Sequence, residues 1–322
     1  MSPSKYSFLG ATIESDVRLP ATPAREGAAT ELRVLCRDTA PPAPDSSWVL
    51  VAARDGSLDH RAWRTNAGHV LAVGGAATLV VSRSLSTMTI FPGSAKDELL
   101  SLWVLGLGLA FWFGLSGDLV LHGSATVGAN ARAVVIVGPR GSGKSTLAGL
   151  LCASGQTLLA DDAVRLERRR AGWIAHGGVT ELRLRHASSN LSTLFASAAV
   201  RQAADGRVAL NPRSASADGY AVNHIVFPVI RPGATPSASR APGTTALVEL
   251  LRGLRFGAWL PGHVQERQTR LAAQLARDVP AHFVNLPGSA EPNAARAAEA
   301  QRWVANLGVE ENEATRELRG AP

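Results

Sequence analysis

One segment, residues 121–166, constrains the fold of this chain more than any other. An apolar run at 133–137 leads into the loop Gly138-Pro139-Arg140-Gly141-Ser142-Gly143-Lys144-Ser145-Thr146. Leucines then recur at helical spacing from Leu147 to Leu151, and Gly155 closes the helix. Strand, loop and helix in this order match the pattern G-x-x-x-x-G-K-[ST]. The segment therefore predicts an α/β domain built around this loop.

The residue types of the loop suit a nucleoside triphosphate. Glycines let backbone N–H groups converge on phosphate oxygens, because a Cβ would block that approach. The following helix points its positive end at the same anion. Lys144 is expected to bridge the outer phosphates, and the Ser145 hydroxyl is expected to ligate magnesium. All nine residues from Gly138 to Thr146 are therefore candidate ATP contacts.

Candidate catalytic side chains follow and precede the loop. A predicted strand from Thr157 ends in Asp161 and Asp162. One such carboxylate can support magnesium and another can act as a base toward an incoming hydroxyl, although a pair of turn or capping aspartates is the alternative. His122 ends the predicted strand 118–122, from which it can orient or tune an aspartate, unless it is purely structural. Glu181 lies on a short predicted strand that is either part of the site or a solvated edge.

The residues before the loop divide into two parts. Short apolar runs separated by turn residues predict an antiparallel, β-rich N-terminal domain over 1–95, with strands at 31–36, 48–52, 69–73, 78–82 and 88–91. The uncharged run Leu99–Leu115 predicts a helix buried between two domains. A membrane span is the alternative, since the run is at the short limit for crossing a bilayer.

The catalytic domain is expected to extend over 96–310, followed by a flexible tail at 311–322. Its later elements are predicted as a hairpin at 164–176, helices at 244–255, 264–277 and 294–307, and a closing strand at 281–286. The net charge of +7 comes from scattered arginines, so nothing favours a nucleic-acid or membrane partner. Cys36 and Cys152 form no disulfide or metal pattern, and the N-terminus lacks a signal peptide, so a cytoplasmic location is expected.

Three blocks together resemble the catalytic domain of HPr kinase/phosphorylase and the HPr-kinase-like serine kinases. They are Leu121-His-Gly-Ser-Ala125, the loop with its preceding Val137, and Gly155-Gln-Thr-Leu-Leu-Ala-Asp-Asp162. Their order and spacing agree over residues 118–290. More loosely, residues 6–20 look like the opening of HPr-kinase-like proteins from peptide natural-product clusters, including lasso-peptide kinases.

The resemblance implies a P-loop fold like the C-terminal domain of HPr kinase and magnesium-dependent phosphoryl transfer from ATP to a serine hydroxyl. It implies that Asp161 acts as the base with support from His122, and that Asp162 and Glu181 join Ser145 around magnesium. HPr kinases carry Glu where this chain has Thr146, and their N-terminal domain is larger. Both departures weigh against HPr as the acceptor and favour another peptide, a protein or a small molecule. A serine hydroxyl of a peptide or protein is the expected acceptor.

Two other functions stay open at this stage. The first is a nucleotide-binding regulatory or assembly ATPase without phosphotransfer, for which a catalytic base would be unnecessary. The second is a membrane-attached ATPase that uses Leu99–Leu115 as its anchor. Assembly into a homo-oligomer is a further expectation from the resemblance.

Overall fold

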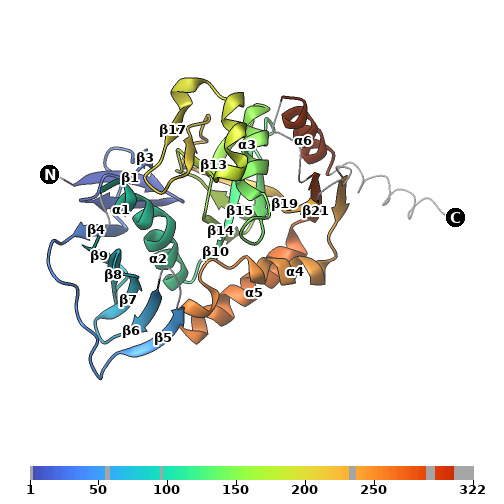
Figure 1. The fold of residues 1–322 in the computed structure, drawn as a ribbon. Coiled ribbons are helices and arrows are strands. Elements are labelled where there is room, and N and C mark those ends of the chain that lie inside the picture. Colours follow the sequence, from blue (N-terminus) through green and yellow to red (C-terminus); the bar gives the residue numbers. More distant parts are fainter. Residues whose placement is uncertain (1–2, 55–58, 95–96, 232–236, 288–293, 308–322) are drawn as a thin grey trace.

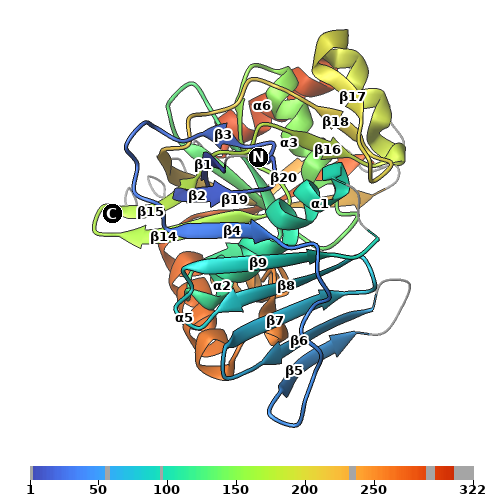
Figure 2. The same cartoon turned by 90° about the vertical axis from the view of Figure 1, so that its left-hand side faces the viewer.

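The N-terminal strands form one twisted sheet, which faces the viewer in Figure 2. The computed structural model describes residues 3–54, 59–94, 97–231, 237–287 and 294–307. The sheet has the order β3-β1-β2-β4-β9-β8-β7-β6-β5. Its strands are β1 (Ser4–Phe8), β2 (Ala11–Ser15), β3 (Thr22–Pro23), β4 (Leu32–Cys36), β5 (Val49–Arg54), β6 (His60–Arg64), β7 (Gly68–Val73), β8 (Ala77–Ser82) and β9 (Thr87–Pro92).

The predicted strands of this region are present, but their pairing is not wholly antiparallel. β4 pairs in parallel with both β2 and β9. The prediction of an antiparallel sheet was wrong here because a long connection from β4 to β5 carries the chain across the sheet to its far edge. Alternating burial along β2 and β8 leaves one face of the sheet apolar and covered.

The apolar run after β9 is helical, and most of its residues are buried. It comprises α1 (Asp97–Trp103), a π-helical turn η1 (Val104–Leu109) and α2 (Ala110–Leu115). By length and composition residues 98–115 could cross a bilayer, yet most of them pack inside the fold. The Trp112 indole donates to the Leu85 carbonyl of the N-terminal sheet at 2.6 Å. On the other side the Phe111 ring lies 5.3 Å from that of Phe256. The expectation of a buried helix is confirmed.

The second sheet follows the path β10-β14-β15-β19-β12-β11-β13, and off this path β21 pairs with β19 and β20 pairs with β21. Its strands are β10 (Leu119–Leu121), β11 (Gly123–Val127), β12 (Ala133–Val137), β13 (Thr157–Ala160), β14 (Val164–Arg169), β15 (Gly172–His176), β19 (Gly219–Arg231), β20 (Ser237–Arg240) and β21 (Ala281–Pro287). Every residue of β11 and β12 is buried, as expected for strands covered on both faces.

Helices cover this sheet on two sides (Figure 1). α3 (Lys144–Ala153) packs with α6 (Ala294–Asn306), and α4 (Gly243–Arg252) packs with α5 (Gly262–Asp278). The smaller sheet β16-β18-β17 consists of β16 (Leu182–Leu184), β18 (Val208–Leu210) and β17 (Val200–Gln202). The 3-10 turns are η2 (His186–Leu194), η3 (Ser197–Ala199) and η4 (Gly257–Trp259). The predicted tail at 311–322 lies outside the described residues.

The β1–β2 hairpin tip joins the N-terminal sheet to the second sheet. The Leu9 amide donates to the Gly177 carbonyl at 2.6 Å, and the Arg165 guanidinium donates to the Leu9 carbonyl at 2.9 Å. Gly10 has a φ of +78°, and a Cβ placed there would lie 2.3 Å from Nδ1 of His176. The buried core is continuous across this junction.

The close approach at Gly10 predicts a selective loss of stability. Gly10→Ala combines a left-handed backbone with a clash against a buried ring, and is expected to cost about 2–5 kcal/mol of unfolding free energy. Gly27→Ala is the matched control, because Gly27 has a φ of +75° with nothing within 4 Å of its Cβ position. Its cost is expected to be only about 1–2 kcal/mol. Urea denaturation measures both, and equal losses would show that the contact with His176 contributes nothing.

Candidate active site

The loop between β12 and α3 has the backbone that its glycines predict. Gly141 and Gly143 have φ angles of +87° and +95°, a region that residues with a Cβ rarely adopt. A Cβ on Gly138 would lie 2.7 Å from Oγ of Ser142. The loop tip, Pro139 to Gly141, is exposed. The loop therefore presents backbone amides to solvent at the start of α3.

Two side chains of the loop have polar atoms that a bound anion could engage. Oγ of Ser142 is buried and has no hydrogen-bond partner among the described residues. Nζ of Lys144 donates to the Pro139 carbonyl at 2.9 Å and so lies folded against the loop. Burial lowers the pKa of Lys144 to about 8.

The topology of β11, β12 and β13 brings the predicted site residues together. β11 is antiparallel to both neighbours, so β12 and β13 run in the same direction. The carboxyl ends of β12 and β13 and the start of β11 therefore share one edge of the sheet. The loop follows β12, Asp161 follows β13, and His122 directly precedes β11. This edge gathers residues that are distant in sequence.

Asp161 is buried at this edge and accepts three hydrogen bonds. Its Oδ1 accepts from the hydroxyls of Ser124 at 2.7 Å and Ser145 at 3.2 Å, and its Oδ2 accepts from the Arg183 amide at 3.1 Å. Burial, and then the charge of Asp162, raise the pKa of Asp161. The carboxyl group is thus held against the first turn of α3 and favours proton uptake.

Asp162 has a different environment although it is the next residue. Its φ is +63°, so the strand has ended and the side chain turns away from that of Asp161. Nη2 of Arg183 lies 3.0 Å and Nη1 of Arg207 lies 3.5 Å from its Oδ2. Burial alone would raise the pKa of Asp162, but the charges of Arg183, Arg255 and Arg207 lower it to about 2. The adjacent carboxyls are therefore suited to different chemistry.

His122 contacts the backbone of Asp162 rather than either carboxylate. Its Nδ1 lies 3.1 Å from the Asp162 carbonyl and 3.0 Å from Nη1 of Arg255. A guanidinium can only donate, so Nδ1 accepts from Arg255 and the neutral ring carries its proton on Nε2. Burial, and then the charge of Arg255, lower the pKa of His122 to about 4. The imidazole is therefore neutral at pH 7.

Arg255 was missed as a site residue, because its predicted position was inside a helix over 244–255. α4 instead ends at Arg252, and a Cβ on Gly253 would lie 2.4 Å from the Val137 side chain. The chain then pairs with β10, where the Arg255 amide donates to the Val120 carbonyl at 2.9 Å. Nη2 of Arg255 donates to the Gly106 carbonyl of η1 at 2.9 Å. A single arginine in a leucine-rich helix pattern carries no sequence signal for this role.

Glu181 lies near the site, but its carboxylate is engaged by an arginine. Nη2 of Arg201 lies 2.7 Å from its Oε1. No group of three or more His, Cys, Asp or Glu side chains suited to a metal occurs in the described part of the chain. Of the predicted metal residues, Ser145 lies against Asp161, while Asp162 and Glu181 each face arginines.

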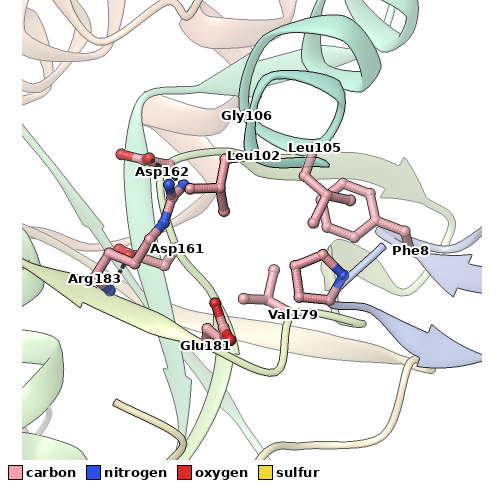
Figure 3. A pocket seen from close by; sticks show the side chains of 10 residues that line it. Phe8, Leu102, Leu105, Gly106, Asp161, Asp162, Val179, Glu181 and Arg183 are labelled. Atoms are coloured by element: carbon pink, nitrogen blue, oxygen red, sulfur yellow. Dashed lines mark hydrogen bonds and ion pairs between the residues drawn. The ribbon is translucent and has the colours of Figure 1, made fainter. Parts of the chain in front are cut away.

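A pocket opens beside the two aspartates (Figure 3). Its apolar wall comes from Phe8 and Pro20 of the N-terminal region, Leu102, Leu105 and Gly106 of the apolar helix, and Val179. Asp161, Asp162, Glu181 and Arg183 also line it, and the two aspartates lie across the pocket from Phe8 and Leu105. The pocket thus combines a carboxylate cluster with an aliphatic surface.

Comparison with known proteins gives distant structural similarity to solved structures. No family model and no curated protein matches the chain. The solved structure of the Hpr(Ser) kinase/phosphatase from Coxiella burnetii is similar over 62% of this chain and 97% of that chain, at 13% sequence identity and a TM-score of 0.33. Similarity this low leaves the function to be inferred from the residues of this chain.

The contact between Arg255 and His122 predicts that removing the arginine shifts the pKa of His122 measurably. Arg255→Met removes a nearby positive charge, so the pKa of His122 is expected to rise above about 4. NMR titration of ¹⁵N-labelled histidine measures the pKa and shows which nitrogen is protonated. Arg252→Met is the matched control, since Arg252 is exposed at the end of α4 and pairs with Glu249. A pKa of His122 unchanged by Arg255→Met would contradict the contact.

Proposed function

We propose that this protein is an ATP- and magnesium-dependent kinase that transfers a phosphoryl group to a serine hydroxyl of a peptide or protein acceptor other than HPr. The observation that carries the proposal is the position of Asp161. This buried carboxyl group touches Ser145 at the start of α3 and also lines a pocket. Contact with the start of α3 on one side and with a pocket on the other supports a role for Asp161 in transfer from a nucleotide to an acceptor.

The loop residues fit a triphosphate. The left-handed backbone at Gly141 and Gly143 would let amides of the loop turn toward an anion, and the unpartnered Ser142 hydroxyl is an additional donor. Lys144 would exchange its contact with the Pro139 carbonyl for a phosphate oxygen. The loop itself, from Gly138 to Thr146, would hold the nucleotide through its backbone.

The residues present also fit magnesium. This ion is commonly held by one or two protein oxygens together with substrate phosphates and water, so a cluster of three protein ligands is not required. Ser145 would supply one oxygen. The carboxylates of Asp162 and Glu181 border the pocket that Asp161 lines, and each would have to leave its arginine partner to supply another. When bound, magnesium would neutralise charge that develops on the transferring phosphate.

The proposed reaction forms one bond and breaks one. The acceptor hydroxyl oxygen forms a bond to the γ-phosphorus, and the bond from that phosphorus to the β–γ bridging oxygen breaks to release ADP. The hydroxyl proton passes to the carboxylate of Asp161, whose raised pKa suits it as a base. Neutral His122 would act indirectly, by accepting from Arg255 and so holding this guanidinium beside the Asp161–Asp162 turn, where its charge lowers the pKa of Asp162.

A regulatory nucleotide-binding protein would not need this base. Asp161→Asn keeps the size of the side chain, but it replaces one acceptor oxygen by an amide donor and cannot accept the proton. Phosphoryl transfer is expected to fall by about 10²- to 10⁴-fold, while a non-hydrolysable ATP analogue still binds. Calorimetric titration and a phosphate-transfer assay measure the two effects separately.

Asp218→Asn is the control, since Asp218 is an exposed carboxylate that pairs with Arg25 far from the site. This variant is expected to transfer phosphate at the wild-type rate. Retained turnover in Asp161→Asn would remove Asp161 as the base.

The lowered pKa of Lys144 predicts pH-dependent nucleotide affinity. The protonated amine attracts phosphate, and the pKa of about 8 in the free protein means that the charge is lost as pH rises above 8. The affinity for the ATP analogue is therefore expected to fall between pH 7 and 9.5, by at most about tenfold per pH unit. Lys144→Arg keeps its charge and should remove this slope. The same slope in both proteins would assign it to another group.

A further inference from the structure

The small sheet β16-β18-β17 carries two arginines in one row. Arg183 of β16 pairs with Ala209 of β18, and Ala209 pairs in turn with Arg201 of β17. Residues paired across neighbouring strands point to the same face of a sheet, so both guanidinium groups extend from one face. Leu182 and Leu184 point to the other face and are buried, and β16 packs against α3. The arginine row therefore lies on the face directed away from α3.

Arg183 is shared between a carboxylate that lines the pocket and one that does not. Its Nη2 lies 3.0 Å from Oδ2 of Asp162, which lines the pocket, and its Nη1 lies 3.1 Å from Oδ2 of Asp205. Arg207 is shared in the same way, with Nη1 3.5 Å from Oδ2 of Asp162 and Nε 3.4 Å from Oδ2 of Asp205. Asp205 would therefore still hold both guanidinium groups if Asp162 turned away.

Arg201 repeats this arrangement at the other end of the row. Its Nη2 lies 2.7 Å from Oε1 of Glu181, which lines the pocket. Its Nη1 contacts Oε1 of Glu98, a residue of α1 outside the lining. Glu98 would therefore still hold Arg201 if Glu181 turned away.

The pocket itself suits a small ion or water rather than an organic group. Its space of about 30 Å³ is room for about two water molecules. Asp161, Asp162 and Glu181 are the acidic side chains of its lining (Figure 3). A guanidinium and magnesium both bind carboxylate oxygens, so they compete for the same acceptors. The release of the arginines therefore limits the uptake of a metal ion.

We propose that Asp205 and Glu98 are positioning residues, which keep their arginines in place when the pocket carboxylates that share them turn to magnesium. The inference rests on the proposed kinase function and concerns how its site admits the metal ion. A guanidinium left without a carboxylate in a partly buried position would offset part of the binding free energy of the metal. The second carboxylate of each arginine reduces that cost.

The Glu98 arm gives the cleaner test, because Asp205 also accepts from the Arg207 amide at 3.2 Å and so shapes its own turn. Mn²⁺, which prefers the same oxygen ligands as Mg²⁺, is titrated into the full chain with a non-hydrolysable ATP analogue, and electron paramagnetic resonance measures free Mn²⁺. Arg201→Met frees Glu181 and is expected to tighten Mn²⁺ binding by about two- to fivefold. Glu98→Gln leaves Glu181 as the remaining carboxylate partner of Arg201 and is expected to weaken binding by a similar factor.

The double variant separates this exchange from a general effect of charge. If Glu98 acts by holding Arg201, Glu98→Gln has no effect on Mn²⁺ affinity once Arg201 is replaced by Met. If Glu98 acts through its own charge, the substitution weakens binding equally in both backgrounds. The ion pair of Glu14 and Arg33 in the N-terminal sheet is the matched control. Glu14→Gln and Arg33→Met are expected to leave Mn²⁺ affinity unchanged.

Phosphate transfer at varied Mg²⁺ provides a second measurement. Glu98→Gln is expected to raise the Mg²⁺ concentration for half-maximal transfer by about two- to fivefold and to leave kcat at saturating Mg²⁺ unchanged. Arg201→Gln replaces Arg201→Met in the comparison if the latter does not fold.

Equal weakening in both backgrounds, unchanged affinity in every variant, or a loss confined to kcat would overturn the positioning role and leave the kinase function standing. If the wild-type chain binds the ATP analogue but neither binds Mn²⁺ nor transfers phosphate, the proposed function fails, and the positioning role fails with it.

Discussion

The burial of the Asp161 carboxyl group is the constraint on which the sheet edge that holds the candidate site depends. A carboxylate removed from water is destabilised by several kcal/mol unless hydrogen bonds replace its hydration. Here the replacements come from three elements, through Ser124 of β11, Ser145 of α3 and the amide of Arg183 in β16. The carboxyl group therefore fixes strand, helix and small sheet against one another. These hydrogen bonds replace the lost hydration only in part, and the pKa of Asp161 therefore stays raised.

The apolar helical segment has a second structural role beyond filling space between the sheets. A π-helical turn places an extra residue in one turn and disturbs the regular hydrogen-bond pattern, and such turns are often found at functional sites. In η1 the Gly106 carbonyl accepts a hydrogen bond from Nη2 of Arg255. Nη1 of the same guanidinium donates to Nδ1 of His122. Gly106 also lines the pocket. The buried guanidinium of Arg255 thus connects the lining of the pocket to His122.

Much of the local structure follows from sequence patterns. The runs at 133–137 and 157–160, the hairpin at 164–176 and the glycine-rich loop are strands and a loop in the structure, because apolar periodicity and turn residues act over short distances. The proximity of His122 to the Asp161–Asp162 turn was also expected. The parallel pairing of β4 depends on long connections, which local patterns do not encode.

The residues that sequence analysis missed share a physical cause. Arg255 becomes a site residue because α4 stops at Arg252. The helix is followed by Gly253, where a Cβ would meet the Val137 side chain, and not by a helix-breaking proline. Phe8 and Leu105 resemble ordinary core residues, since a pocket wall and a core position have the same composition. Only the folded structure distinguishes a pocket residue from a core residue, because Phe8 and Leu105 each have one side next to the pocket.

The electrostatic difference between the two aspartates shows why neighbouring identical residues need not be redundant. The left-handed backbone at Asp162 rotates its carboxylate toward Arg183 and Arg207, while Asp161 is left with hydroxyl and amide donors. Arginine charges stabilise the ionised form of Asp162, whereas burial and the charge of Asp162 destabilise that of Asp161. The fixed negative charge therefore makes its neighbour more basic. A proton from an acceptor hydroxyl would be taken up at Asp161, beside a carboxylate that stays ionised.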